Sequence, residues 1–454
     1  MIAGLLRAIE ADFPTQQLII GGDSSWTASE FLAEAGLYGA ALAARGTQRL
    51  AIHLPDSPQL LALLCGTNLA GAAVCVLNHD FESEQLRESL DTMQGDLLVT
   101  DLDGHVGVDC PVVGPEELRE TGLQSAPLST AEVVDSEFLI LTSGTTGKPK
   151  CVRYLWSDLI RQVRPSARSR GARWLLAYHL NHFAGIQMFM HVLVNRAALV
   201  VPDSGSVSDM LVAARANEVT HISASPTFWR FAIAQLQAED EPLPGLQQIT
   251  LGSEVVTPSL LESLNALFPR IRVTQVYAST EAGSCVAVSD GRAGLPVSIL
   301  DYDEDAPVRF RIEDGQLFIY SRHGMRGFLS DTSNVQGEWR ATGDLVRIEG
   351  DRIVFLGRQS ELINVGGVKV HPVHVEDLVA TVEGVKLVKA YGKPNAIMGQ
   401  IVAVDLVLED GADEEGIEER VFEACLSLDR HSRPRLVNVV RELDIVNRKL
   451  VRSG

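Results

Sequence analysis

The stretch F-L-I-L-T-S-G-T-T-G-K-P-K, from Phe138 to Lys150, is the segment around which this 454-residue chain is organised. Its first four residues predict a short buried strand, and the loop that follows contains glycines and hydroxyl residues before it ends at two lysines. In such a loop, glycines let backbone N–H groups approach an anion, hydroxyls add donors and lysines supply positive charge. The spacing differs from the G-x-x-x-x-G-K-[ST] Walker pattern, and a flexible linker rarely follows an apolar strand so directly. The stretch therefore predicts a loop that holds phosphate.

Alternating helices and strands on both sides of this loop predict an α/β fold. A capping box at Thr27 and Glu30 begins a helix that ends at Gly46. Further helices are expected at 58–70, 83–93, 156–162, 226–237 and 258–268. Strands are expected at 50–54, 74–77, 97–100, 174–178, 221–224, 249–251 and 273–277. This alternation is typical of parallel sheets covered by helices, with ligands at the carboxyl ends of the strands. The segment 106–132 shows no period and is expected to cross the surface as an irregular connection.

The C-terminal third of the sequence has a different pattern. Short runs between glycines, at 308–312, 316–320 and 352–355, predict an antiparallel subdomain. The last part predicts a small α+β domain, with a helix at 414–426 and strands at 387–391, 401–408 and 437–440. A turn after Arg358 marks the boundary, so we expect one domain over residues 1–358 and a second over 359–454.

Composition and charge limit the classes of function. A net charge of −20 disfavours nucleic acid and anionic lipid as partners, so small ligands are expected. Six cysteines without C-x-x-C spacing indicate neither a zinc site nor a disulfide framework. The N-terminus lacks the pattern of a signal peptide, and no apolar run reaches the roughly 18 residues of a membrane helix. A cytoplasmic location without membrane insertion is therefore expected.

Two polar segments stand directly after predicted strands. In Tyr277-Ala-Ser-Thr-Glu281, the glutamate and the threonine are suited to hold Mg²⁺ and a phosphate oxygen. Gly252-Ser-Glu254 follows the preceding strand and offers a turn that begins with small residues. For either segment alone, an ordinary polar turn after a strand is the alternative.

Four more candidate segments follow. Trp339-Arg-Ala-Thr-Gly-Asp344 ends in a carboxylate, which matches two neighbouring hydroxyl donors, and Gly357-Arg358 comes soon after. The segment 363–376 contains paired glycines, and Asn447-Arg-Lys-Leu-Val-Arg452 places Lys449 close to the C-terminus. A turn aspartate, a surface arginine and a solvated basic tail are the alternatives for these residues.

Together with the phosphate loop, these segments resemble the acyl-adenylate-forming (AMP-binding) superfamily, which contains acyl-CoA synthetases, the adenylation domains of peptide synthetases and firefly luciferase. The resemblance extends over most of the chain. It implies that the small C-terminal domain is mobile and swings about a hinge near Arg358, with Ser360 at the hinge position. It also implies an ATP site formed by Thr142, Ser143, Gly144, Thr145, Thr146, Gly147, Lys150, Gly252, Ser253, Glu254, Tyr277, Ala278, Ser279, Asp344 and Arg358.

The resemblance further implies a catalytic role for four residues. Thr280 would contact phosphate and Glu281 would bind Mg²⁺. Lys449 would reach the α-phosphate and the substrate carboxylate. His182, in the pattern H-x-x-G, would gate the acyl pocket, and an ordinary core or surface histidine is the alternative.

The implied reaction has two halves. A carboxylic acid attacks ATP to give an acyl-adenylate and pyrophosphate, and a thiol then displaces AMP. The thiol would belong to CoA or to the phosphopantetheine of a carrier protein, and it would pass a channel lined by Gly366 and Gly367. A stand-alone adenylation enzyme that loads a carrier protein and an inactive nucleotide-binding regulator are the alternatives to a CoA ligase.

The residues near His182 indicate which class of carboxylic acid is expected as the substrate. Peptide-synthetase domains usually hold the α-amino group of their substrate with an aspartate in this region, and no acid occurs between Tyr178 and Arg196. An acid without an α-amino group is therefore favoured. Apolar and aromatic residues expected in the pocket suit an aryl or medium-sized acyl acid: Phe183, Gln187, Met188, Ser225, Phe228, Trp229 and the surroundings of Gln275.

Overall fold

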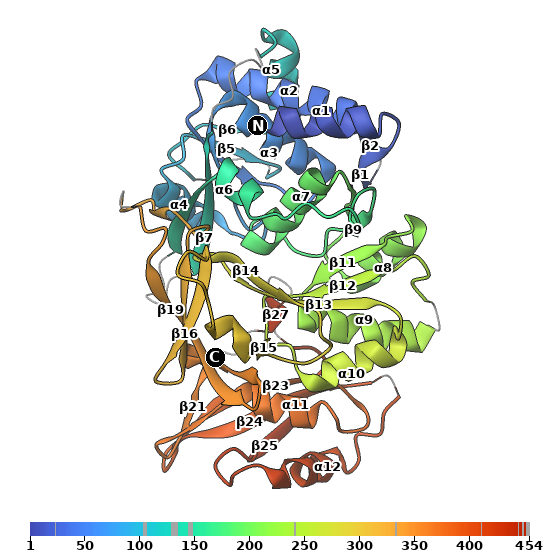
Figure 1. The fold of residues 1–454 in the computed structure, drawn as a ribbon, viewed down its shortest axis with the longest axis vertical. Coiled ribbons are helices and arrows are strands. Elements are labelled where there is room, and N and C mark those ends of the chain that lie inside the picture. Colours follow the sequence, from blue (N-terminus) through green and yellow to red (C-terminus); the bar gives the residue numbers. More distant parts are fainter. Residues whose placement is uncertain are drawn as a thin grey trace.

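Two helix-covered sheets form most of the first two thirds of the chain, and two five-stranded sheets and a two-stranded one follow among the described residues (Figure 1). The computed structural model describes residues 1–22, 24–102, 107–128, 135–143, 149–239, 242–331, 334–409, 411–443, 445–446 and 449–450. This arrangement confirms the expected fold class, with parallel α/β layers, an antiparallel subdomain and a C-terminal α+β domain.

The first sheet has the strand order β18-β8-β7-β4-β3-β5-β6. Its strands are β3 (Arg49–His53), β4 (Ala73–Val76), β5 (Leu97–Thr100), β6 (Val112–Val113), β7 (Glu137–Ser143), β8 (Pro149–Leu155) and β18 (Gly327–Phe328). The five strands from β7 to β6 run parallel, whereas β8 pairs antiparallel with β7. The helices of this region are α1 (Ile2–Asp12), α2 (Ala28–Arg45), α3 (Pro58–Ala70), α4 (Ser83–Met93) and α5 (Pro115–Gln124).

The second sheet has the order β14-β13-β12-β11-β9-β10-β1-β2. Its strands are β1 (Gln17–Gly21), β2 (Ser24–Thr27), β9 (Arg173–Leu175), β10 (Ala198–Val200), β11 (His221–Ala224), β12 (Gln248–Leu251), β13 (Arg272–Ser279) and β14 (Gly283–Val288). The accompanying helices are α6 (Trp156–Arg161), α7 (Phe183–Asn195), α8 (Val207–Ala216), α9 (Pro226–Glu239) and α10 (Pro258–Leu267). The strands β11, β12 and β13 run parallel. The carboxyl end of β12 leads into the Gly252 segment, and that of β13 leads into the Thr280 segment.

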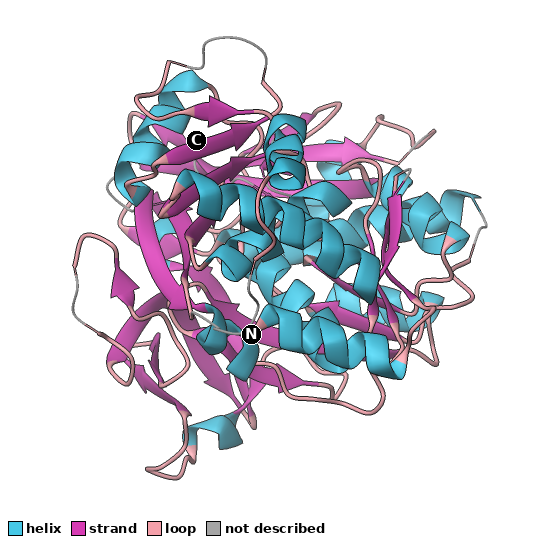
Figure 2. Ribbon diagram, turned by 90° about the horizontal axis from the view of Figure 1, so that it is seen from above, coloured by secondary structure: helices cyan, strands magenta, loops and turns pink. Residues whose placement is uncertain are grey.

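A single hydrophobic cluster joins the two large sheets. Ile52 of β3 and Leu199 of β10 belong to it, together with residues of α1, α2, α3 and α7. Figure 2 shows helices gathered in the middle of the molecule with strands beside them. Burial of this shared apolar surface fixes the two sheets relative to each other.

The antiparallel subdomain has the order β15-β20-β19-β17-β16. Its elements are β15 (Leu295–Pro296), η1 (Val297–Leu300), β16 (Val308–Glu313), β17 (Gln316–Ser321), β19 (Trp339–Glu349) and β20 (Arg352–Arg358). Asp344 therefore lies inside a long strand, directly opposite Arg358 of β20.

The C-terminal α+β part begins after the short helix η2 (Gln359–Glu361) and lies at the opposite end of the molecule from α5 (Figure 1). It contains β21 (Ile363–Val365), β22 (Val368–Val370), α11 (Pro372–Val379), β23 (Val385–Asn395), β24 (Gly399–Leu408), α12 (Ile417–Ala424), η3 (Cys425–Ser427), β25 (Leu436–Val439), β26 (Ile445–Val446) and β27 (Lys449–Leu450). The domain boundary after Arg358 stays a prediction.

Local signals account for the elements that were expected. Thr27 and Glu30 form the capping box of α2, and Gly46 ends the helix with a φ of 70°. Ser57 caps α3 through the Leu60 N–H, and Pro58 stands in its first turn. Each of these contacts lies within one turn of the chain, so the sequence pattern is sufficient to predict them.

One expectation was wrong. Within 106–132, the structure contains β6 and the regular helix α5, whose first turn carries Glu116 and Glu117 after Pro115. Only Leu118 and Gly122 of this helix are buried, so its apolar period is too sparse to detect. A Cβ at Gly122 would clash with the backbone carbonyl of Leu37, which shows that α5 is held by close packing against α2.

Candidate functional site

A cavity of about 250 Å³ lies where the second sheet, the antiparallel subdomain and the C-terminal part meet. Its lining combines residues of five predicted segments, 252–254, 277–281, 339–344, 357–358 and 363–376, and lies on both sides of the predicted domain boundary. The lining residues are Ser253, Glu254, Val255, Val256, Gln275, Val276, Tyr277, Ala278, Gly294, Leu295, Asp344, Phe355, Gly357, Arg358, Glu361 and Val373.

Asp344 is held in this lining by residues from two other strands. The Tyr277 hydroxyl donates a short hydrogen bond to one carboxylate oxygen, and the Arg358 Nε lies 3.3 Å from the other. Burial, followed by the Asp344 charge, raises the pKa of Tyr277, so this hydroxyl stays a donor. The carboxylate is thereby oriented at the cavity, where its remaining lone pairs can accept further hydrogen bonds.

The Tyr277 ring stacks on Phe355, with ring centroids 5.1 Å apart and an angle of 23° between the planes. The sequence gave no direct indication of Phe355. In β20, however, side chains alternate between faces, so Phe355 shares a face with Gly357, next to the predicted Arg358. This alternation is the signal that identifies Phe355.

The Gly252 segment forms a tight turn after β12. The Tyr178 hydroxyl donates to the Gly252 carbonyl at 3.2 Å, and a Cβ at Gly252 would lie 3.4 Å from the Val276 carbonyl oxygen. Ser253 has a φ of 72°, in the left-handed region that is uncommon for residues with a side chain. The turn thus brings small side chains and backbone to the cavity wall, as a flat ring such as adenine requires.

Glu254 lines the cavity and also contacts the start of a helix. Its two carboxylate oxygens accept hydrogen bonds from the Thr227 N–H at 2.9 Å and the Thr227 hydroxyl at 3.0 Å. Thr227 lies in the first turn of α9, where N–H groups favour a negative charge. The Glu254 carboxylate therefore stabilises a helix start while the residue lines the cavity.

The Thr280–Glu281 turn connects β13 to β14 just beyond the cavity lining. The Tyr154 hydroxyl donates to the Thr280 carbonyl at 2.9 Å, and the Met325 N–H donates to the Glu281 carbonyl at 2.9 Å. The Ala282 N–H donates to the Ser279 hydroxyl at 3.0 Å. These contacts engage the backbone of Thr280 and Glu281, so the turn is fixed through its carbonyl groups.

Glu281 fits a magnesium site that is completed by phosphate. The described residues contain no group of three or more His, Cys, Asp or Glu that would form an all-protein metal site. Mg²⁺ in nucleotide sites is commonly bound by one or two carboxylates plus phosphate oxygens and water. A single half-buried carboxylate at the end of β13 is therefore sufficient for such a site.

The residues on either side of the predicted phosphate loop lie in the paired strands β7 and β8. Thr142 lies opposite Lys150, and Ser143 lies opposite Pro149. The Lys150 ammonium is 5.5 Å from the centre of the Phe328 ring, a cation–π contact. Gly144, Thr145, Thr146 and Gly147 lie outside the described residues, so their role stays a prediction.

His182 is the residue before α7, and the glycine of its H-x-x-G pattern has a packing role. A Cβ at Gly185 would clash with the His179 carbonyl, so α7 approaches this segment closely. Asp56 accepts a hydrogen bond from the Leu180 N–H at 3.0 Å and lies 2.7 Å from the His179 Nδ1. Among the described residues, this segment is not part of the cavity lining, and the gating role of His182 stays a prediction.

The C-terminal residues are divided between two places. Gly366 and Gly367 form the exposed turn between β21 and β22, with φ values of 59° and 89°. Among the described residues, this turn lies outside the cavity lining. The backbone of Lys449 lies in β27, which contacts α9 and is drawn in red near the middle of Figure 1. The structure therefore brings the strand of Lys449, but not the paired glycines, to the large domain.

Two pocket residues expected from the sequence belong to the core instead. Phe228 and Trp229 are 2% and 0% exposed, and Trp229 packs edge-on against Phe228 and Phe268. Gln275 does line the cavity, where its side-chain amide donates to the Arg292 carbonyl at 2.5 Å. The sequence places several aromatic residues at the start of α9, but it does not show which of them face the core.

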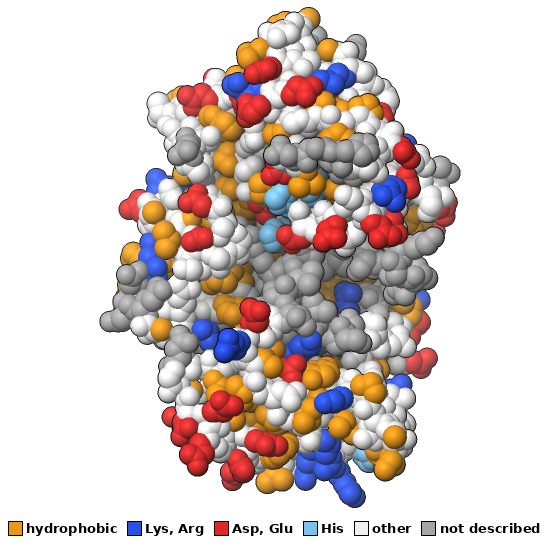
Figure 3. All heavy atoms as spheres, turned by 180° about the vertical axis from the view of Figure 1, so that it is seen from behind, with side chains coloured by type: hydrophobic (Ala, Val, Ile, Leu, Met, Phe, Trp, Pro, Cys, Tyr) orange, Lys and Arg blue, Asp and Glu red, His pale blue; other side chains and the backbone are white. Residues whose placement is uncertain are grey.

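Acidic side chains are spread over the face in Figure 3, and basic ones stand among them mainly on its lower half. All six cysteines are described, and they form no disulfide. Within the described ranges, no helix has the length and apolar character needed to cross a membrane.

Comparisons with known proteins agree with this geometry. The chain is 27% identical over 393 residues to 2-succinylbenzoate–CoA ligase of Bacillus velezensis, with 81% of this chain and 79% of the relative covered. Its fold is similar to anthranilate CoA ligase in complex with anthranoyl-AMP (TM-score 0.84, 17% identity, 98% and 95% covered). It is also similar to o-succinylbenzoate CoA synthetase of Bacillus subtilis in complex with ATP and magnesium ion (TM-score 0.76, 22% identity, 99% and 98% covered).

A family model described as AMP-binding enzyme matches residues 7–329, which is more than half of the chain. This match confirms the resemblance drawn from the motifs. The protein belongs to the AMP-binding enzyme family.

Proposed function

We propose that the protein activates a carboxylic acid with ATP through an acyl-adenylate, releases pyrophosphate and transfers the acyl group to CoA. The acid is an aryl or medium-sized acyl acid without an α-amino group. The observation that carries the proposal is the convergence of Ser253, Tyr277, Asp344 and Arg358, from four different strands or turns, on one cavity. Small side chains and backbone on one side of the cavity leave room for the flat base of a nucleotide, and the fixed Asp344 carboxylate can bind its ribose.

The residues of this chain would act mainly by positioning the reactants. Asp344, held by Tyr277 and Arg358, accepts hydrogen bonds from the ribose hydroxyls. Glu281 would bind Mg²⁺ at the phosphate end of the nucleotide, and the Thr280 hydroxyl would contact phosphate beside it. Mg²⁺ bound there offsets the charge that develops on pyrophosphate. Lys449 stabilises the negative charge at the α-phosphate when the α9–β27 contact brings its strand to the site.

The nature of the acid and of the acceptor is inferred from two further observations. α7 contains no acidic residue, and the Asp56 carboxylate beside this segment already contacts His179 and the Leu180 N–H. This environment supports an acid without an α-amino group. The relative that covers four fifths of the chain is an aryl acid–CoA ligase by name, which supports an aryl acid and CoA.

Pyrophosphate release tests the proposal. Purified protein would be incubated with Mg·ATP and a panel of aryl, acyl and amino acids, with CoA, with a phosphopantetheinylated carrier protein, or without acceptor. We expect acid-dependent release with at least one aryl or acyl acid and an acyl-CoA product when CoA is present. Thioester formation on the carrier protein alone would favour the loading enzyme.

An inactive nucleotide-binding regulator is the remaining alternative. It predicts ATP binding by calorimetry without acid-dependent release from any acid. The presence of Thr280, Glu281, Asp344 and Lys449 argues for activity. A cytoplasmic location of the reaction stays a prediction.

A further inference from the structure

The carbonyl of Glu281 is held by a segment from outside the second sheet. The Met325 N–H donates to it at 2.9 Å, and Met325 itself is buried in the main hydrophobic cluster. A Cβ at Gly324 would lie 2.6 Å from the same carbonyl oxygen. The Glu281 backbone therefore rests directly on residues 324–325, and any displacement of that segment moves the proposed metal ligand.

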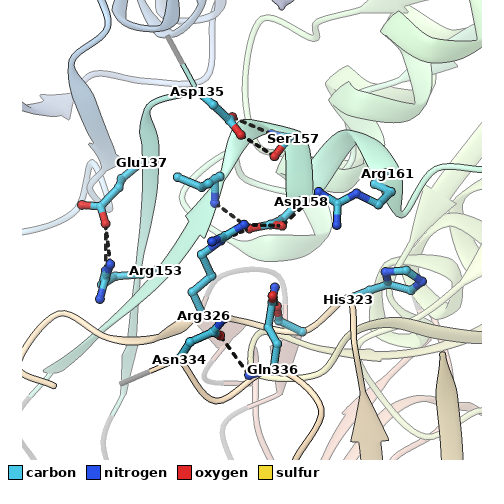
Figure 4. Close-up of polar contacts among 12 residues, drawn as sticks. Asp135, Glu137, Arg153, Ser157, Asp158, Arg161, His323, Arg326, Asn334 and Gln336 are labelled. Carbon is cyan, nitrogen blue, oxygen red and sulfur yellow. Dashed lines mark hydrogen bonds and ion pairs between the residues drawn. The ribbon is translucent and has the colours of Figure 1, made fainter. Parts of the chain in front are cut away.

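The next residue of this segment, Arg326, forms a buried ion pair with Asp158 of α6 (Figure 4). The Arg326 Nε lies 2.6 Å from one Asp158 oxygen, and its Nη2 lies 3.2 Å from the other, which is a two-point contact. The Asp158 side chain is 1% exposed, whereas Arg326 is 32% exposed. Figure 4 shows Asp158 between Arg326 and Arg161, whose Nη2 is 3.4 Å from Asp158.

The two ends of this pair are each fixed to their own element. Asp158 accepts a hydrogen bond from the Leu155 N–H at 3.0 Å, which ties it to the start of α6. The Arg326 N–H donates to the Arg153 carbonyl at 2.8 Å, which ties it to β8. Buried ion pairs contribute little net stability once the cost of desolvating both charges is included. An apolar pair that fills this space would therefore be about as stable. What an apolar pair lacks is the directional contact that sets the register of 324–326 against α6.

We infer that Asp158 and Arg326 are a positioning pair, which sets the Thr280–Glu281 turn for metal and phosphate binding through the Met325 N–H. The inference rests on the proposed function. The same element, β8, also supplies Tyr154, whose hydroxyl donates to the Thr280 carbonyl at 2.9 Å. Both carbonyl groups of the turn are thus held from the side of the first sheet, while the Glu281 side chain remains for the metal.

The test compares charge-neutral and charge-keeping variants. Removal of one partner weakens the charge compensation at the buried Asp158 site and risks unfolding, so the main variant is the double substitution Asp158→Asn with Arg326→Gln. Arg326→Lys keeps the charge but loses the two-point geometry. The matched control is Glu137→Gln with Arg153→Gln, which removes the neighbouring ion pair of 2.8 Å on the β7–β8 hairpin (Figure 4).

The measurements are the Mg²⁺ concentration for half-maximal pyrophosphate release, the thermal midpoint, and amide hydrogen exchange of peptide 279–285. We expect the main variant to raise the half-saturating Mg²⁺ concentration about tenfold or more, the range typical for residues that support a metal ligand. Exchange in 279–285 should also accelerate. Arg326→Lys should give an intermediate shift, and the control should give none.

Two results would overturn the inference. One is a wild-type Mg²⁺ dependence and exchange rate in a folded main variant with a lowered thermal midpoint, which would make the pair purely structural. The other is an equal shift in the control. If wild-type protein releases no pyrophosphate with any acid, the proposed function fails. The positioning role is then decided by exchange in 279–285 and by calorimetric binding of Mg·ATP to wild type and the main variant.

Discussion

At the scale of single residues, Asp344 is the most informative position, because its two oxygens contact residues from two other strands at the cavity. We expect Asp344→Ala to weaken ATP binding by about 2–4 kcal/mol, since two charge-assisted hydrogen bonds to the ribose are lost. Isothermal calorimetry with ATP measures this directly. Asp351→Ala is the matched control, because Asp351 pairs with Arg292 on the surface and is 71% exposed. An unchanged ATP affinity in Asp344→Ala would remove this residue from the nucleotide site.

A second residue-scale prediction concerns acid stability. His221 is 3% exposed, and its ring centroid lies 4.8 Å from that of Trp174. Burial, followed by the neighbouring His191, lowers the pKa of His221 to about 4. The unfolded chain therefore binds a proton below about pH 6.5, while the folded chain binds it only near pH 4. This contribution to the free energy of unfolding is present above pH 6.5 and decreases by at most about 1.4 kcal/mol per pH unit as the pH falls toward 4.

Urea unfolding at several pH values between 4 and 7 checks this sign for wild type and His221→Gln. The substitution removes the titrating group, so its profile should fall less steeply than that of wild type over this window. Parallel profiles would show that His221 does not contribute to the acid sensitivity. The comparison isolates His221 because the other histidines titrate in both proteins.

At the scale of elements, local patterns predicted the helices with clear start and stop signals. α2, α3, α4 and α10 begin and end within a few residues of the expected positions, because their caps and turns are formed by neighbours in sequence. α5 was missed for the opposite reason. Its stability depends on the contact of Gly122 with α2, and a contact between distant segments leaves little trace in local periodicity.

Glycine substitutions test this packing of α5 against α2. Gly122→Ala should lower the free energy of unfolding by about 1–3 kcal/mol, because the new Cβ clashes with the Leu37 carbonyl. Gly36→Ala is the matched control on α2, where a Cβ meets no atom within 4 Å among the described residues. That change should raise stability by about 0.5–1 kcal/mol through helix propensity. Urea unfolding measures both, and equal effects would argue against the close contact.

At the scale of the whole molecule, the question is how the C-terminal part serves two half-reactions. The Ser259 hydroxyl of α10 donates to Asp377 of α11 at 2.6 Å, and β27 contacts α9. In this orientation the strand of Lys449 lies against the large domain. Among the described residues, the paired glycines Gly366 and Gly367 lie outside the cavity lining in this orientation, and the swing of the C-terminal part stays a prediction.

Lys449→Ala should separate the two half-reactions. We expect it to form almost no adenylate from ATP and acid, since the positive charge at the α-phosphate is lost. It should still convert supplied acyl-adenylate and thiol to thioester within about tenfold of wild type, a barrier difference of about 1.4 kcal/mol. Single-turnover assays of each half measure this, with Lys386→Ala of β23 as the control. Equal loss of both halves would mean that Lys449 is structural or serves both steps.

The sequence by itself determined the α/β class and the positions of most elements, and it indicated the segments that we predict to bind the nucleotide. Capping residues, strand patterns and glycine-rich turns act over a few residues, so they can be recognised from the sequence alone. The order of the motifs along the chain was likewise enough to identify the family.

Only the tertiary structure decided which residues meet. It placed Asp344 against Tyr277, joined Asp158 to Arg326 across 168 positions, and turned Phe228 and Trp229 into the core instead of the substrate pocket. The physical reason is that the direction of a side chain depends on the packing of elements far apart in sequence. A local pattern shows that a residue is apolar or charged, whereas burial and pairing are settled when the sheets and helices come together.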